Sequence, residues 1–223
     1  DNGFSDFDVY GYNIFDLLNE YKFLFDKVIE NEWFGLIIKS KTPNSIVYHI
    51  KNSFNDLYKK VINSGRCYIL SESQISSDRN THRIPAEFAM ASDMVLHNSI
   101  LAGTAGIESI LSSTPTIFFD SLGWHSFIEE DENSVPLVFR DWNKLWEHLE
   151  VCFKNSNADN LNNWSNIVDK FDQFRDGRSH ERINFFILNL IKNLDTYREK
   201  NKAMDQTVLE YTNLWGEDKI IKY

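Results

Sequence analysis

The stretch "DMVLHNSILAGTAGIESILSSTPTIFFD", residues 93–120, decides the fold of this chain. It contains two short apolar runs, Met94–Leu96 and Thr116–Phe119, separated by a turn of small residues and an amphipathic segment. Runs of this length between polar ends are typical of strands that are buried on both faces. A strand, a helix and a second strand in this order favour parallel pairing through a right-handed crossover.

The same alternation extends along the chain in both directions. Further apolar runs that predict strands lie at Leu36–Ile38, Cys67–Leu70 and Leu137–Phe139. Helices are predicted where apolar residues recur at helical spacing: Ile14, Leu17, Leu18, Tyr21, Leu24 and Val28, then Trp142, Leu145, Trp146 and Leu149, and finally Ile183, Phe186, Ile187, Leu190 and Leu194. We therefore predict an α/β fold, with an open, mostly parallel Rossmann-like sheet and helices on both faces, over residues 1–195. Residues 196–223 are predicted to form a C-terminal helix or tail.

Two residues mark the starts of predicted helices. Pro85 suits the first turn of a short helix through Met90, because the amide hydrogen that proline lacks would be unpaired there in any case. Asp141 suits the capping position before the helix that carries Trp142.

Composition excludes some classes of function. The 223 residues carry a formal net charge of -10, which is the wrong sign for a protein that binds nucleic acid through its phosphates. No apolar stretch is long enough to cross a bilayer and no signal-peptide pattern is present, so we expect no integral membrane segment and a location in the cytoplasm, the inner face of the membrane included. The two cysteines, Cys67 and Cys152, favour core thiols over a disulfide framework.

Polar residues follow several of the predicted strands directly. Lys39 and Lys41 follow the first run, His97 and Asn98 follow Met94–Leu96, and Asp120 follows Thr116–Phe119. In an open parallel sheet the ligand crevice lies beyond the carboxyl ends of the strands. These side chains are therefore candidates for one binding site, although every strand must end in something polar.

The turn at Gly103 and Thr104 has features of a phosphate site. Gly103 permits close approach of the backbone to a ligand, and Thr104 can cap the next helix. The first amides of a helix have no intrahelical partner and carry partial positive charge, which suits a phosphate. Glu108, one turn later, could accept hydrogen bonds from a ribose. The alternatives are an ordinary strand-to-helix connection and a solvated glutamate, and the absence of GxGxxG and GxxxxGK[ST] disfavours a dinucleotide enzyme or a P-loop protein.

Other candidates have weaker patterns. His97 and His125 could donate to a sugar or phosphate or transfer a proton, or could be structural. Arg178 and Arg182 either reach the crevice or form a solvated helix start. No HExxH or CxxC motif occurs, so we predict no metal site, and no cofactor is implied.

The order of these motifs resembles the carboxyl-terminal donor-binding domain of GT-B glycosyltransferases, especially those that make bacterial surface polysaccharides. The matching segments are "FGLIIKSKTP", "RIPAEFAMASDMVLHNSILAGTAGIESILSSTPTIFFD" and "FRDGRSHERINFFILNLI". The resemblance implies that the diphosphate of a nucleotide-sugar donor rests on Gly103, Thr104 and Ala105, with Glu108 toward the ribose. It also implies transfer of the sugar to a saccharide acceptor.

Two departures from that family pattern matter. Ser40 and Lys41 stand where the family often has proline and histidine, so Lys39 or Lys41 could neutralise the phosphates. The chain also has room for only one Rossmann-like half, so a missing N-terminal domain or a partner subunit is expected to complete the enzyme. The alternatives are a sugar-nucleotide 2-epimerase or a polyol-phosphate transferase of the same fold, and a noncatalytic binding or scaffold domain.

Overall fold

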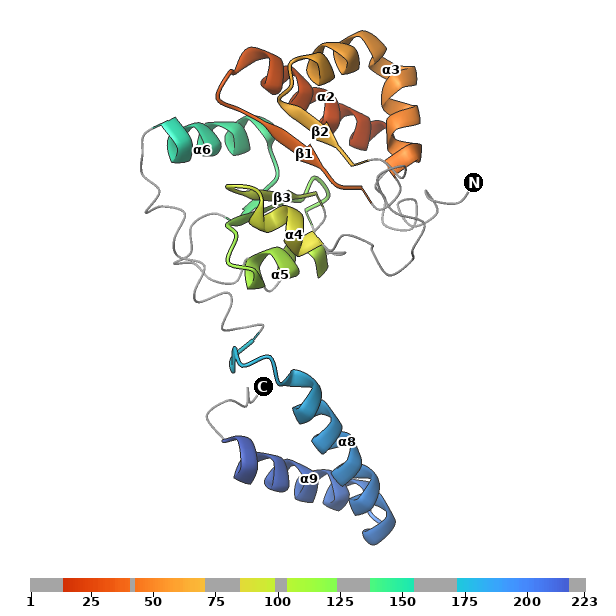
Figure 1. The fold of residues 1–223 in the computed structure, drawn as a ribbon. Helices are drawn as coiled ribbons and strands as arrows, with labels where there is room; N and C mark the ends of the chain where they lie inside the picture. Colours follow the sequence, from red (N-terminus) through yellow and green to blue (C-terminus); the bar gives the residue numbers. More distant parts are fainter. Residues whose placement is uncertain are drawn as a thin grey trace. The chain divides into compact units, whose positions relative to one another are not determined.

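The structure, a computed structural model, describes residues 14–40, 43–70, 85–98, 104–123, 137–154 and 172–216. These residues form seven helices and five short strands (Figure 1). In chain order the elements are α2 (Ile14–Glu30), β1 (Leu36–Ile38), α3 (Pro43–Asn63), β2 (Cys67–Ile69), α4 (Pro85–Met90), β3 (Val95–His97), α5 (Thr104–Leu111), β4 (Thr116–Phe119), β5 (Val138–Phe139), α6 (Trp142–Lys154), α8 (Ser179–Thr196) and α9 (Lys200–Trp215). Internal contacts divide the chain into an N-terminal unit, residues 1–165, and a C-terminal unit, residues 166–223.

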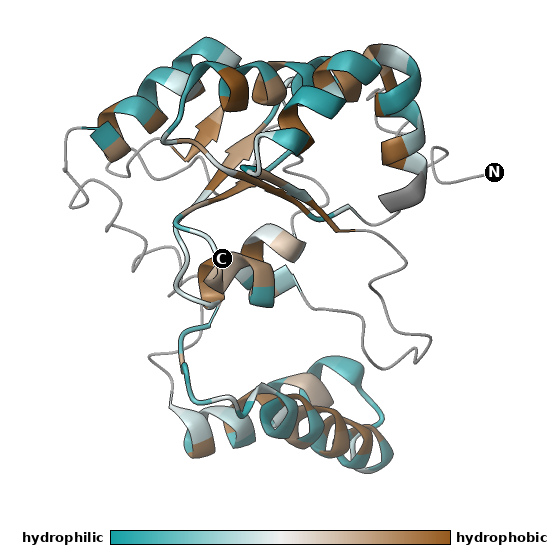
Figure 2. Ribbon diagram, turned by 45° about the horizontal axis from the view of Figure 1, so that its top comes forward, coloured by the Kyte–Doolittle hydropathy of each residue, from teal (hydrophilic) through white to brown (hydrophobic). Residues whose placement is uncertain are grey.

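The strand pairs that the structure describes in the N-terminal unit are all parallel, as the sequence predicts. β1 pairs with β2, and β4 lies between β3 and β5 in a second sheet. Helices α2, α3 and α6 lie on one side of the strands, and α4 and α5 lie on the other (Figures 1 and 2). The N-terminal unit is therefore a mixed α/β structure with open parallel sheets, compatible with a Rossmann-like fold.

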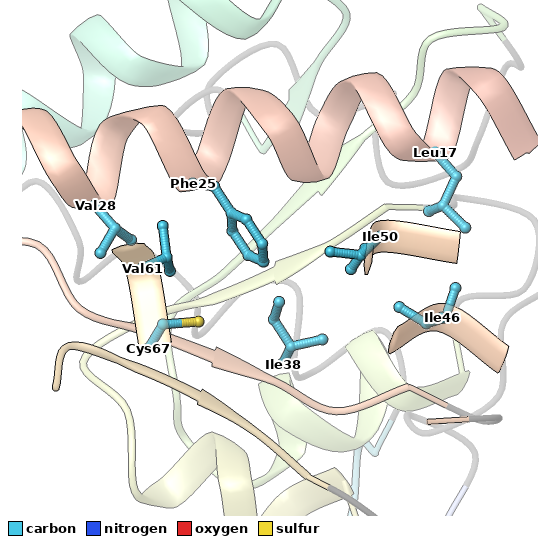
Figure 3. Packing of buried hydrophobic residues seen from close by; sticks show 8 residues of the cluster. All are labelled: Leu17, Phe25, Val28, Ile38, Ile46, Ile50, Val61 and Cys67. Atoms are coloured by element: carbon cyan, nitrogen blue, oxygen red, sulfur yellow. The ribbon is translucent and has the colours of Figure 1, made fainter. Parts of the chain in front are cut away.

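The first core lies where α2 and α3 cover β1 and β2. Phe25, Ile50 and Val61 have no exposed surface and meet the strand residues Ile38 and Cys67 (Figure 3). Burying a side chain of this size contributes about 1.5 to 3 kcal/mol. These contacts come from the apolar face that the sequence predicts for residues 14–28 and from a helix at 43–63.

The opposite face of β1 and β2 differs from the sequence expectation. Ile37 and Tyr68 lie opposite each other in the parallel register, and each keeps 40% of its surface exposed. The prediction that these strands are buried on both faces is therefore wrong, because α2 and α3 both pack on the side of Ile38 and Cys67. β4 is different, since all four of its residues are buried.

An aromatic cluster forms the second core. Ile117 and Phe119 of β4 pack with Leu145 and Trp146 of α6. The ring of Phe119 stacks on that of Trp142 at a centroid distance of 4.1 Å. The residues that complete this core from α2 and from the segment before β1 are Phe23 and Phe34. Helix α6 therefore packs against the three-stranded sheet through the face that the sequence predicts.

Several predicted element boundaries are confirmed. Helix α4 starts at Pro85, and Asp141 Oδ1 accepts hydrogen bonds from the amides of Asn143 (3.0 Å) and Lys144 (2.9 Å) as the cap of α6. The third strand begins and ends one residue later than the run Met94–Leu96. Within the described residues, no helix combines the length and the apolarity that crossing a bilayer requires.

The C-terminal unit is a hairpin of α8 and α9. The sequence places the domain boundary at residue 195, but α8 groups with α9 and not with the sheet-containing unit. Asn193 of α8 donates a hydrogen bond to Thr207 Oγ1 of α9 at 3.0 Å. The residues buried in the two helices are small or polar: Arg182, Asn193, Ala203 and Thr207.

Arg182 ties the start of α8 to the segments on either side of the hairpin. Its side chain is 5% exposed and makes two hydrogen bonds to Asp176, at 2.9 and 3.0 Å. Its guanidinium carbon lies 3.8 Å from the ring centre of Phe174 and 5.4 Å from that of Trp215. Arg182 is therefore a buried residue of the C-terminal unit, not part of a solvated helix start.

This ion pair predicts a loss of stability in acid. The hydrogen bonds from Arg182 lower the pKa of Asp176 from 3.8 to about 2 in the folded protein. Because the folded-state pKa is depressed, the stabilisation is complete above the ordinary pKa and is lost as the pH falls through 3.8 toward 2. In thermal melts across that range, the midpoint of the wild type should fall more steeply than that of Asp176→Asn. Parallel midpoint curves for the two proteins would contradict this.

Candidate functional site

The candidate site lies at the edge where β3, β4 and β5 end. His97 is the last residue of β3 and pairs in register with Phe118 of β4. Asp120 directly follows β4, and its amide donates to the carbonyl of Phe139 at 2.8 Å. Arg140 directly follows β5. Parallel pairing therefore brings the polar residues that follow these three strands to one edge.

Helix α5 approaches this edge closely because residue 106 has no side chain. A Cβ atom added to Gly106 would lie 2.5 and 2.8 Å from two ring carbons of Phe118 and 3.4 Å from His97 Cβ. Gly106 is in the first turn of α5, so the helix begins against β3 and β4. The start of α5 and the end of β3 are thereby held together.

Asp120 and Arg140 form an ion pair in which one partner is buried and the other is exposed. The Asp120 side chain is 3% exposed, the Arg140 side chain is 46% exposed, and Arg140 Nε lies 3.4 Å from Asp120 Oδ2. That geometry is an ion pair without a hydrogen bond, and Asp120 Oδ2 accepts no hydrogen bond from any described residue. A buried carboxylate oxygen thus keeps accepting capacity beside a cation that reaches solvent.

A second polar contact connects the strand edge to α2. Asn98, the residue after β3, donates to Glu20 Oε2 at 3.4 Å, and Glu20 is only 5% exposed. Burial, together with the neighbouring Glu20 carboxylate, raises the pKa of the Tyr21 hydroxyl. The side chain of Asn98 is therefore held by α2.

The other predicted site residues lie on α5, after β1, or outside the described parts of the chain. Thr104 and Glu108 are exposed on α5, one turn apart, and the carbonyl of Ala105 accepts a hydrogen bond from Ser109 Oγ at 2.7 Å. Lys39 is exposed at the carboxyl end of β1, in the two-stranded sheet. The residues of the prediction that lie outside the described parts of the chain are Lys41, Gly103 and His125.

No family model, curated protein or solved structure matches this chain. The function of the chain is therefore inferred from the chemistry of the strand edge.

Two residues of this site were not predicted from the sequence. Arg140 follows the fifth apolar run just as Asp120 follows the fourth, so the strand-end rule applied once more would have found it. Glu20 lies three residues after Leu17 and four before Leu24, within the apolar face of a predicted helix. A carboxylate at such a position is a sign of a buried polar contact.

Metal and thiol chemistry find little support in the described residues. Those residues contain no group of three or more His, Cys, Asp or Glu side chains placed to hold a metal ion. Cys67 and Cys152 are both buried and free, as predicted. Burial raises the pKa of the Cys67 thiol to about 12 and also raises that of Cys152, which lies 3.5 Å from His148 Nε2, so burial disfavours the thiolate form of both residues.

Proposed function

We propose that the edge of β3, β4 and β5 binds the diphosphate and ribose of a nucleotide-sugar donor, and that this chain is the donor-binding half of a GT-B glycosyltransferase. The reaction would be transfer of the donor sugar to a saccharide acceptor in the assembly of a cell-surface polysaccharide. A second Rossmann-like half, in the same protein or in a partner subunit, would supply the acceptor site.

The observation that carries the proposal is the fit of α5 against the ends of β3 and β4. Because Gly106 lets the helix pack directly on Phe118 and His97, the helix begins at the strand edge, at Thr104. Helix amides at such an edge favour an anion. Glu108, exposed one turn further along, is available to the ribose hydroxyls.

Arg140 adds a cation to this donor site. Its half-exposed guanidinium can contact a phosphate oxygen while the buried carboxylate of Asp120 holds it near the end of β5. Gly123, which follows β4 with a φ of +72°, lies beside it, since a Cβ there would be 3.9 Å from Arg140 Nε. The described start of that loop, residues 120–123, therefore comes close to Arg140, whose side chain keeps 46% of its surface exposed.

The proposed mechanism is electrostatic. As the bond between the sugar and the diphosphate breaks, negative charge develops on the nucleotide leaving group. The α5 amides and Arg140, with Lys39 or Lys41 as further cations, would stabilise that charge more strongly in the transition state than in the bound donor.

Calorimetric titration of the full chain with UDP, GDP, CDP and dTDP tests the proposal. We expect saturable binding of at least one of them, competed by pyrophosphate. Arg140→Ala should weaken it by about 10-fold or more, the effect of losing a charge-assisted hydrogen bond. Thr104→Val, which removes a hydroxyl, and Glu108→Ala, which removes the ribose acceptor, should each weaken it less.

Lys154→Ala is the matched control. It also removes one positive charge from the N-terminal unit, but Lys154 is at the end of α6, where it pairs with Glu150 at 2.7 Å. If Arg140→Ala and Lys154→Ala weaken nucleotide binding equally, the loss of net charge alone explains the effect. That result would contradict the contact between Arg140 and the donor phosphate. Absence of binding to all four nucleotides would favour the scaffold alternative. Product analysis with the matching nucleotide sugar separates glycosyl transfer from epimerisation.

A further inference from the structure

The α8–α9 hairpin buries its polar residues and exposes its large apolar ones. Its interior is made by Arg182, Asn193, Ala203 and Thr207. In contrast, Ile183, Ile187 and Ile191 keep 60%, 49% and 53% of their surface exposed. Ile183 and Ile187 belong to the apolar helix face that the sequence predicts, and both are exposed, whereas Phe186 and Leu190 of the same face are half-buried. Phe186 and Tyr211 meet between the helices, with ring centres 5.9 Å apart, but the exposed isoleucines gain little from the packing of α8 on α9.

Several of the exposed residues, together with the half-buried Tyr211, form one surface, which we name the hairpin face. On α8 it comprises Ile183, Ile187, Ile191 and Leu194, which recur at helical spacing, and on α9 it comprises Met204, Val208 and Tyr211. Figure 2 shows hydrophobic residues along both helices. A hollow of about 420 Å³ lies between the helices on this face, lined mainly by Ile183, Phe186, Ile187, Val208 and Tyr211.

The C-terminal unit, which contains the hairpin, differs from the N-terminal unit in formal net charge. The C-terminal unit contains ten basic and ten acidic residues, whereas the N-terminal unit contains 13 basic and 23 acidic residues. The whole formal charge of -10 therefore belongs to the N-terminal unit. Arg182, the charged residue at the hollow, is neutralised by Asp176. Two copies of this face can meet without electrostatic repulsion, and the face offers no net charge for recognition of a charged partner.

The size of the hairpin face fits a dimer interface. Helices of 18 and 16 residues are about 27 and 24 Å long, and two adjacent helices are about 20 Å wide. The face therefore projects on the order of 500 Å², and its corrugated accessible surface is larger. This approaches the value of about 800 Å² per partner that is typical of specific complexes.

We propose that the hairpin face binds the hairpin face of a second copy of this chain, so that two hairpins form a four-helix bundle around a two-fold axis. In such an isologous pair the same surface is used by both copies. Apolar side chains of each copy fill the hollow of the other, and Arg182, Asn193 and Thr207 stay in the interior of their own hairpin.

Light scattering after size exclusion, with the full chain over a range of concentrations, tests this inference. The chain has a mass of 26.2 kDa, so we expect a species of twice that mass, about 52 kDa. Ile187→Glu should raise the dimer dissociation constant by about 100-fold or more, because the dimer would bury two unpaired carboxylates. Since Ile187 is half exposed in the hairpin, the far-ultraviolet circular dichroism of the variant should equal that of the wild type.

Leu209→Glu provides the matched control on the opposite side of α9. Leu209 is 52% exposed and Ile187 is 49% exposed, but Leu209 does not line the hollow. This variant should remain a dimer. A wild-type chain that is monomeric at every concentration, or equal effects of the two substitutions, would overturn the proposal. Neither result depends on nucleotide binding, so the outcome is independent of the proposed donor site.

Discussion

Replacing Gly106 with valine is expected to lower the free energy of unfolding by about 3 kcal/mol, the upper part of the range for an overpacked core. Even the first atom of a side chain would lie 2.5 Å from a ring carbon of Phe118. Phe118 has no exposed surface, so its ring has no free space to enter. Urea denaturation followed by far-ultraviolet circular dichroism measures the change.

A double-mutant cycle shows whether the close approach to Phe118 is the cause. Alanine in place of glycine inside a helix gains about 1 kcal/mol, which the clash with Phe118 should outweigh in Gly106→Ala. In a Phe118→Leu background the ring is gone, so the same alanine should cost less or become stabilising. The prediction fails if Gly106→Ala has the same effect in both backgrounds, or if Gly106→Val is as stable as the wild type.

The strands and their parallel pairing could be predicted because apolar runs and alternation with helices are local features of the sequence. Thr116–Phe119 was predicted at its observed bounds, and all four residues are buried. The exposure of Ile37 and Tyr68 could not be predicted, because it depends on which sheet face the helices cover. An apolar run has the same pattern whether a helix covers one face or two.

The hairpin shows the same limit more strongly. The apolar face of α8 is evident in the sequence, and standard reasoning about amphipathic helices directs it toward the core. In the structure Arg182 and Asn193 are buried and Ile183 and Ile187 are exposed, because α9 meets α8 through the buried residues Ala203 and Thr207 and through the ring of Tyr211 on Phe186. The identity of the packing partner decides which face is buried, and that information is not local.

At the candidate site the strand-end rule was informative. It selected His97, Asn98 and Asp120, which the structure places at the carboxyl ends of β3 and β4. It gave no indication that Asn98 is held by Glu20 of α2, 78 residues earlier. Contacts between elements distant in sequence need the tertiary arrangement. The roles given to Lys41, Gly103 and His125 stay predictions.

Replacing Arg182 with alanine is expected to lower the thermal unfolding midpoint of the C-terminal unit by about 10 °C or more. The substitution removes two hydrogen bonds to Asp176 and the cation that lies over the ring of Phe174, 5.4 Å from the ring centre of Trp215. It also leaves the Asp176 carboxylate without its strongest partner. Trp215, whose ring centre lies 5.4 Å from the Arg182 guanidinium carbon, is one of six tryptophans, and the part of the tryptophan fluorescence change that Arg182→Ala shifts follows the transition.

Two further variants separate burial from charge. Arg178→Ala removes the arginine at the N-cap of α8, whose guanidinium also lies 5.3 Å from the ring centre of Trp215. Because that side chain is 53% exposed and pairs with Glu181 at the surface, the midpoint should fall much less than in Arg182→Ala. Arg182→Lys keeps the charge but loses the planar fork that fits a carboxylate and stacks on an aromatic ring, so its midpoint should lie between those of Arg182→Ala and the wild type. A midpoint for Arg182→Ala no lower than that for Arg178→Ala would mean that the stacked ion pair does not stabilise the hairpin. The stability of the C-terminal unit would then come from the contact between α8 and α9.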